Sequence, residues 1–206
     1  MKIMSMILLL TLVTSGAIAE TYVTSGVIPQ QTTSWHSFVW LEQFNPARGE
    51  LQSMTVTVGG ALIGEFRHEI TGTTPGSWSD EMTVTLHASL NDEVIIIFDG
   101  AYAAEGNLSP YDGFLDFEGN SGATHPFSIP LAGGVTRSTG FGSYVGTGTI
   151  PIQVIAHSNA SLSQSRSGTM ESSATCGATV SISYVYTPAA VANENASWSD
   201  VKTLFR

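Results

Sequence analysis

The residues best suited to chemistry in this 206-residue sequence lie in one acidic stretch without regular patterning, residues 99–125. Asp112, Asp116, Glu118 and Asn120 lie close together there, with glycines beside them that permit sharp turns. Carboxylate and amide oxygens are the ligands that Ca²⁺ prefers, although the spacing does not follow an EF-hand loop. The stretch therefore predicts either a solvated acidic loop or a calcium site formed by these four residues.

Aromatic side chains offer a second kind of binding site, for a carbohydrate or another surface ligand. Tyr102 and Tyr111 lie in the same acidic stretch, Trp78 falls in a predicted Gly/Thr/Pro-rich loop over residues 71–79, and Trp35 opens a predicted strand. Exposed rings can stack on a ligand, but large aromatic side chains more commonly pack over the core. Both alternatives stay open for Trp78, Tyr102 and Tyr111.

Recognised catalytic motifs are missing from the sequence, which contains no G-x-S-x-G, H-E-x-x-H, P-loop or G-x-G-x-x-G pattern. The five histidines are scattered, show no zinc-ligand spacing and are predicted to be ordinary surface residues. They are His36, His68, His87, His125 and His157. Cys176 is the only cysteine, so no internal disulfide is expected. It falls on an apolar strand face, which predicts a buried, inert thiol.

The first nineteen residues predict export. Lys2 precedes an apolar run, and Ala17-Ile18-Ala19 is a small-x-small cleavage pattern, so residues 1–19 are typical of a secretory signal peptide cut before Glu20. Cleavage leaves six basic residues against seventeen acidic ones, a formal charge of −11. A surface of that sign repels phosphate backbones and anionic lipids, which argues against nucleic-acid binding. We expect an extracellular or cell-surface protein without a transmembrane anchor in the mature chain.

Alternating apolar and polar residues organise the rest of the chain, most clearly over residues 51–69. Met54, Val56 and Val58 share one face of a period-2 pattern whose other face is Ser and Thr, as in a strand with one side on a core. Gly59-Gly60 interrupts this pattern. The strand is therefore expected either to bulge there and continue, or to turn into a hairpin.

Shorter period-2 segments predict about nine or ten strands in all. They cover residues 21–28, 35–41, 82–90, 94–98, 127–131, 135–141, 145–157 and 174–186. Residues 159–173 are Ser-rich and predicted to be a flexible loop. Because no convincing helix precedes residue 190, we predict an all-β fold over residues 20–188, an antiparallel two-sheet β-sandwich of jelly-roll or Ig-like type.

Residues 189–206 change in character and predict a linker followed by a short amphipathic helix. Trp198, Val201 and Phe205 fall at i, i+3 and i+7, with Leu204 beside them and basic residues late in the segment. The segment either docks on the sandwich or is a sorting tag read by export machinery. The candidate tag residues are Trp198, Val201, Lys202, Leu204, Phe205 and Arg206.

Five short motifs together resemble the bacterial choice-of-anchor E domain family over most of residues 21–188. They are F-N-P-x-x-G-x-L at 44–51 with the S-M-T-V-T-V strand after it, D-F-E-G-N-S-G at 116–122, Y-V-G-T-G-T-I-P-I at 144–152 and V-S-I-S-Y-V-Y-T-P at 180–188. The resemblance implies an exported β-sandwich of unknown biochemical role, followed in different members by different sorting signals, often of the PEP-CTERM kind. This chain departs from that ending: it has W-x-x-V-K-x-L-F-R and no Pro-Glu-Pro motif.

Together these features predict an exported bacterial protein of the cell surface or extracellular matrix, structural or adhesive and non-enzymatic. Its expected partners are a surface glycan or matrix component, and export or sorting machinery through the tail. The alternative is a carbohydrate-binding or calcium-dependent ligand-binding module, with calcium as the only cofactor considered. A hydrolase is the least favoured function.

Overall fold

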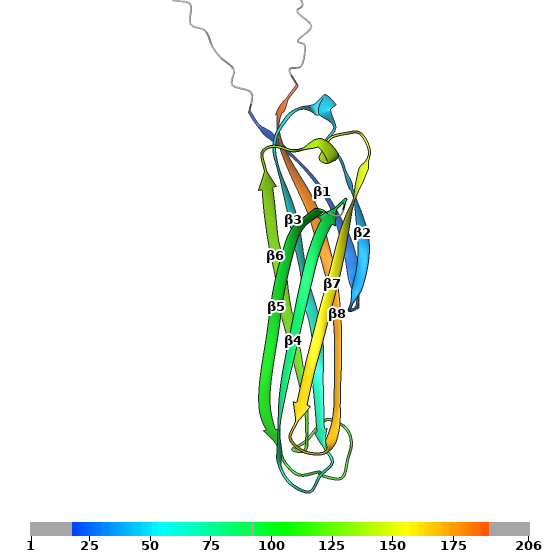
Figure 1. Ribbon diagram of the computed structural model, residues 1–206, viewed down its shortest axis with the longest axis vertical. Coiled ribbons are helices and arrows are strands. Elements are labelled where there is room, and N and C mark those ends of the chain that lie inside the picture. Colours follow the sequence, from blue (N-terminus) through cyan, green and yellow to red (C-terminus); the bar gives the residue numbers. More distant parts are fainter. Residues whose placement is uncertain (1–17, 92, 190–206) are drawn as a thin grey trace, which may run out of the picture.

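The protein is a sandwich of two four-stranded antiparallel sheets (Figure 1). The computed structural model describes residues 18–91 and 93–189. This architecture confirms the predicted all-β two-sheet sandwich. Residues 1–17 of the predicted signal peptide, and the C-terminal segment from residue 190 with its predicted helix and sorting residues, lie outside the described part of the chain.

The strands follow a jelly-roll order. Sheet A has the order β1-β8-β3-β6 and sheet B the order β2-β7-β4-β5, so the chain passes repeatedly between the sheets, as in an eight-stranded jelly roll rather than an Ig fold. The strands are β1 (Glu20–Thr32), β2 (Trp35–Glu42), β3 (Gly49–Ile70), β4 (Gly76–Leu90), β5 (Glu93–Leu108), β6 (Gly122–Arg137), β7 (Thr149–Gln164) and β8 (Gly168–Pro188). Two short 3₁₀ turns, η1 (Pro46–Arg48) and η2 (Gly142–Tyr144), lie in the connections.

β3 runs unbroken through Gly59-Gly60 and makes the molecule long. It pairs with β6 and β8 in constant register across both glycines, so the predicted hairpin is wrong and the strand continues without a bulge there. A Cβ at Gly60 would collide with the Gly177 carbonyl on β8, which explains the glycine by close backbone approach. At about 3.3 Å per residue, the 22 residues of β3 span roughly 70 Å.

Several predicted loops are strand. β5 extends to Leu108 and β6 begins at Gly122, so the irregular stretch shrinks to the loop 109–121. The two strands predicted around Gly133-Gly134 are the single strand β6, and the predicted flexible loop 159–173 is the β7–β8 hairpin. These segments are rich in Ser, Ala and Gly, whose weak contrast between faces hides the alternation although the ladder continues.

Two prolines lie where strand pairing is irregular or one-sided. Pro29 follows the predicted strand 21–28 but lies inside β1, at a register irregularity between Ile28 and Gln31. Pro151 on β7 pairs with Trp40 of β2, whereas β4 pairs with β7 only as far as Gln153. Pro151 therefore lies where β7 has a strand on one side only, an edge position that tolerates proline.

One large apolar cluster and a smaller one, formed by Ile70, Trp78 and Leu108, lie in the interior, and the two ends of the molecule differ. Glu20 pairs with Tyr186, so both termini of the described chain lie at one end, which we call the proximal end (Figure 1). The opposite, distal end carries three connections: residues 71–75, 109–121 and 165–167. No helix in the described part of the chain is long and apolar enough to span a membrane.

Candidate functional site

The three distal connections are joined into one surface by backbone hydrogen bonds. Thr71 N donates to Ser167 O at 3.0 Å, and Tyr111 N donates to Gly72 O at 2.9 Å. Ile70 N donates to the Ser121 carbonyl at 2.9 Å. Residues far apart in the sequence therefore form one distal end, and most of the candidate site residues lie in it.

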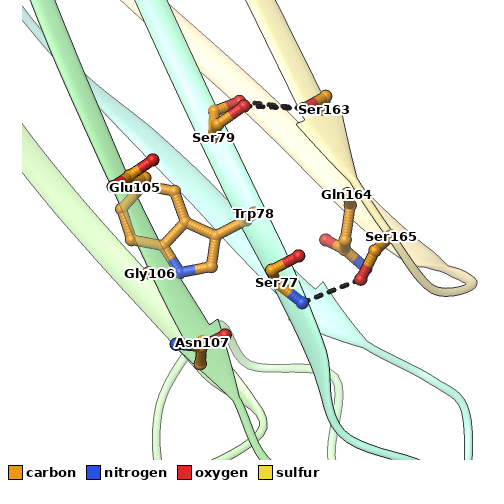
Figure 2. Close-up of a pocket in the computed structure, with 9 residues that line it drawn as sticks. All are labelled: Ser77, Trp78, Ser79, Glu105, Gly106, Asn107, Ser163, Gln164 and Ser165. Carbon is orange, nitrogen blue, oxygen red and sulfur yellow. Dashed lines mark hydrogen bonds between the residues drawn. The ribbon is translucent and has the colours of Figure 1, made fainter.

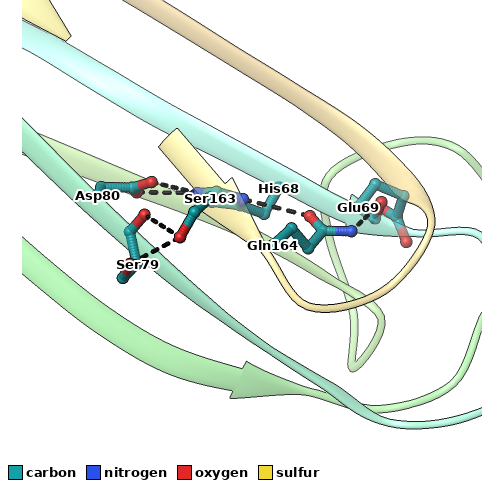
Figure 3. A network of polar contacts seen from close by, with 6 residues as sticks. All are labelled: His68, Glu69, Ser79, Asp80, Ser163 and Gln164. Carbon is teal, nitrogen blue, oxygen red and sulfur yellow. Dashed lines mark hydrogen bonds and ion pairs between the residues drawn. The ribbon is translucent and has the colours of Figure 1, made fainter. Parts of the chain in front are cut away.

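A buried polar network lies beneath this surface (Figure 3). His68 Nε2 lies 2.7 and 2.8 Å from the two carboxylate oxygens of Asp80, and both side chains are buried. His68 Nδ1 lies 3.3 Å from Gln164 Oε1. The Gln164 amide nitrogen donates to the carbonyls of Glu69 at 3.4 Å and Arg166 at 3.1 Å, which fixes the orientation of the amide.

This network holds the fold rather than presenting a proton-transfer group. Both ring nitrogens of His68 face acceptor oxygens, Nε2 the Asp80 carboxylate and Nδ1 the Gln164 amide oxygen. Neither nitrogen is left to take a proton from a nucleophile. The prediction that His68 is a surface residue is wrong, because the inward face of β3 continues from Phe66 to His68, opposite Asp80 of β4.

Trp78 is enclosed by the same cluster. It lies in β4, not in a loop, and its side chain is only 6% exposed. Its ring stacks against His68, with centroids 5.0 Å apart, and against His125 at 4.1 Å. A Cβ added at Gly106 would lie 2.7 Å from the indole. With its ring covered in this way, Trp78 offers no stacking platform for a ligand.

His125 is the partly buried member of this stack. Its Nε2 is buried and finds no hydrogen-bond partner within the described part of the chain. Burial lowers the pKa of His125, an effect that Asp80 opposes and His68 reinforces. Burial therefore disfavours the charged form of the ring.

Two other candidate aromatic residues also pack against the core. Tyr102 is half-buried and packs against Phe66 and Phe127, with ring centroids 6.3 and 5.3 Å apart. Trp35 is half-buried and donates its indole N–H to the Cys176 carbonyl at 3.0 Å. Cys176 itself is buried, as predicted, and desolvation raises the pKa of its thiol. Only Tyr111 of the three predicted ligand-binding aromatics is exposed.

The acidic loop directs its side chains to its own backbone. Asp112 Oδ1 accepts from Phe114 N at 3.0 Å, and Asp116 Oδ1 accepts from Glu118 N at 2.9 Å, as Asx turns do. Within residues 18–91 and 93–189, no group of three or more His, Cys, Asp or Glu side chains is placed to hold a metal ion. The structure does not bring Asp112, Asp116, Glu118 and Asn120 together as ligands, so calcium binding stays a prediction.

Glu69 anchors the loop from below, a role that sequence reasoning missed. Its fully buried carboxylate accepts from Phe117 N at 2.8 Å through Oε2. Glu69 precedes the end of β3 and faces the side opposite His68, under the loop 109–121. Its charged neighbours in the sequence, Arg67 and His68, gave no signal of its burial.

The same loop exposes an apolar tip, defined here as Tyr111, Phe114 and Leu115. Phe114 is 69% exposed and Leu115 56% exposed, and Tyr111 lies exposed beside them. Sequence reasoning selected Tyr111 but not the other two. The pattern Y-D-G-F-L-D-F contained the signal, because apolar residues in a loop between turn-forming Asp and Gly cannot all reach the core.

A shallow groove of about 630 Å³ lies on sheet B, over β4, β5 and the end of β7 (Figure 2). It is lined by Ser77, Trp78, Ser79, Glu105, Gly106, Asn107, Ser163, Gln164 and Ser165. Ser79 and Ser163 hydroxyls bond across it at 2.8 Å, and Ser77 N donates to Ser165 Oγ at 2.8 Å. The lining offers hydroxyl, amide and carboxylate groups and no basic side chain, so it suits a neutral polar or cationic ligand.

Comparisons with known proteins add no family. No family model and no curated protein matches the chain. A structure of the infectious bursal disease virus Gx strain is 10% identical with a TM-score of 0.25, over 84% of this chain and 37% of that one. A structure of Desmodium yellow mottle tymovirus is 8% identical with a TM-score of 0.23, over 94% and 95%. These likenesses carry no argument about function, and the choice-of-anchor E resemblance stays untested.

Proposed function

We propose that the protein is an exported, non-enzymatic adhesive or structural module that presents its distal loop at the end of a rod. The observation that carries this proposal is the exposed apolar tip, Tyr111, Phe114 and Leu115, at the end opposite both described termini. Export rests on the signal-peptide pattern of residues 1–19. A bacterial cell surface or its extracellular matrix is the setting that suits these features.

The architecture supports a rod that holds the distal loop away from the end at which the protein is attached. β3 and β8 pair from Gly49–Pro188 at the proximal end to Ile70–Gly168 at the distal end, so one continuous ladder spans roughly 70 Å. A molecule held by either terminus would therefore carry its distal loop away from the point of attachment.

The chemistry of the tip suits weak, repeated contact. Fully burying a Phe or Leu side chain contributes about 1.5–3 kcal/mol, so Phe114 and Leu115 together provide about 3–6 kcal/mol. The loss of translational and rotational freedom on association costs a comparable amount or more. One tip alone therefore binds weakly, and useful adhesion needs many copies side by side. Asp112, Asp116 and Glu118 beside the tip favour an apolar surface that also carries basic groups.

Bead adhesion tests the proposal. Beads densely coated with the protein through its C-terminal end are allowed to settle on octyl, polylysine and mixed octyl–lysine surfaces, and the retained fraction is counted under flow. We expect the strongest retention on the mixed surface, and its loss in the Phe114→Ser, Leu115→Ser double variant. Val27→Ser removes an exposed apolar residue from the outer face of β1 and is the matched control. Equal retention of all three proteins would contradict the proposal.

Glycan binding in the serine-lined groove is the second candidate function. Its support is the groove of about 630 Å³, whose Ser77 and Ser79 hydroxyls, Asn107 amide and Glu105 carboxylate can bond to sugar hydroxyls. A glycan array probed with and without calcium tests it. Binding that Asn107→Ala removes and Phe114→Ser preserves would favour the groove over the tip.

A further inference from the structure

A second exposed apolar surface lies on the outer face of sheet B, far from the distal tip. We call it the outer-face patch and define it as Phe38, Trp40, Ile97, Pro151 and Ile155. Trp40 is 65% exposed and Phe38 51% exposed on β2, and Ile97 is exposed on β5. We propose that residues 190–206 of the same chain bind this patch.

Strand register places four of the patch residues on the neighbouring strands β2 and β7, with Ile97 on β5, across His87 of β4. Trp40 lies opposite Pro151, and two residues along β2 Phe38 lies opposite Gln153. The next row crosses the whole sheet as His36, Ile155, His87 and Ile97. Paired residues are about 5 Å apart across strands, and same-face residues about 7 Å apart along them. An apolar area of this extent on an otherwise Ser- and Thr-rich surface marks an interaction site.

The C-terminal segment begins close to this patch. The last described residue, Ala189, donates its backbone N–H to the Arg48 carbonyl at 2.9 Å. The Arg48 guanidinium lies 4.2 Å from the Tyr22 ring centroid, and the Tyr22 hydroxyl bonds to Glu42. Glu42 is the next outward-facing residue after Trp40 on β2. The segment thus starts a few side chains from the edge of the patch.

The length of the segment suffices to reach the patch. Eight residues, 190–197, separate Ala189 from Trp198, and at about 3.3–3.6 Å per residue they extend roughly 28 Å. Trp40 lies about 7 Å along β2 from Glu42. The reach therefore covers the proximal half of the patch with length to spare.

The amino-acid composition of the segment is complementary to the apolar patch. Its apolar residues, Trp198, Val201, Leu204 and Phe205, recur at a spacing that gathers them on one side of a helix. Residues 190–206 carry two acidic and two basic side chains, and both basic ones fall in the last five residues, on a chain whose formal charge is −10. Glu42 at the margin of the patch is a partner of the right sign.

Tethering favours this occupant over a second copy of the chain. A segment joined beside its own binding surface meets that surface at an effective concentration on the order of millimolar, so even weak affinity suffices. A second copy would have to bring an equally acidic surface against this one. The inference goes beyond the adhesive function, since it concerns the opposite end of the molecule.

Fluorine NMR of the full chain labelled with 5-fluorotryptophan tests the inference. The chain has four tryptophans, and Trp40→Phe and Trp198→Phe assign the two resonances of interest. We expect Phe205→Ser to move the Trp40 resonance and to raise its H₂O/D₂O solvent shift towards that of an exposed indole. Thr203→Ala, which falls on the other side of a helical segment, is the matched control and should leave it unchanged.

The reciprocal experiment separates cis binding from other outcomes. Phe38→Ser should move the Trp198 resonance, whereas Val27→Ser on sheet A should not. Both effects should be the same after tenfold dilution. A Trp40 resonance indifferent to Phe205→Ser would overturn the inference, and a response that fades on dilution would assign the patch to a second copy instead.

Discussion

Replacing Trp78 by alanine should destabilise the fold strongly. The side chain is 6% exposed and its ring lies between the imidazoles of His68 and His125. A tryptophan buries about 200 Å², which at about 25 cal/mol per Å² gives an upper value of ~5 kcal/mol. Measured Trp→Ala costs in cores are about 3–5 kcal/mol. We therefore expect Trp78→Ala to lower the free energy of unfolding by about 4 kcal/mol.

Urea unfolding followed by far-UV circular dichroism measures this loss without relying on the missing indole. For a domain of this size, 1 kcal/mol corresponds to roughly 2–4 °C in Tm, so the thermal midpoint should fall by about 8–16 °C. Phe114→Ala removes an exposed ring and should change stability by less than about 0.5 kcal/mol. A Trp78→Ala protein of unchanged stability that had lost glycan binding would refute the enclosed-ring account and restore the stacking platform.

Three further predictions follow from the distal end. Because the pKa of His125 is lowered in the fold, the unfolded chain takes up the proton first as pH falls through about 6.5. The wild type should therefore lose stability towards pH 5 more steeply than His125→Phe in urea titrations at several pH values. Parallel pH profiles of the two proteins would contradict the lowered pKa. Gly106→Ala places a methyl 2.7 Å from the Trp78 indole and should lower the free energy of unfolding by about 1–3 kcal/mol in the same assay. Gly142→Ala, whose added methyl has nothing within 4 Å, should leave that free energy unchanged. Equal losses in the two variants would place the indole elsewhere. EDTA should leave the thermal midpoint unchanged, and a calcium-induced rise that Asp116→Ala abolishes would instead establish the predicted calcium site.

Alternation predicted the fold class because the inward residues contrast strongly with the outward ones in most strands. Met54, Val56 and Val58, and likewise Val84 and Leu86, are buried as their period-2 pattern indicates. The strand ends were missed where that contrast vanishes. Residues 99–108 and 159–164 place Ala, Gly and Ser on the faces, so only the hydrogen-bonded ladder reveals them as strand.

The candidate site was harder to predict because it buries residue types that usually lie on the surface. Continuing the inward face of β4 from Met82 back through Asp80 to Trp78 would have placed both in the interior, and the same step from Phe66 leads to His68. A charged residue on an inward face is uncommon unless it is paired, and the partner comes from another strand. Such pairing depends on strand order and register, which one sequence does not specify.

The measurement that tests the central claim most directly is adhesion force as a function of tethering point. Single molecules are held through the C-terminal end, or through a Gly113→Cys attachment within the distal loop in a Cys176→Ala background, and pressed on a mixed octyl–lysine surface. The account predicts frequent unbinding events for the first tether and few for the second, because Phe114 and Leu115 then face the support. Equal event frequencies from both tethers would show that the distal tip is not the contact surface.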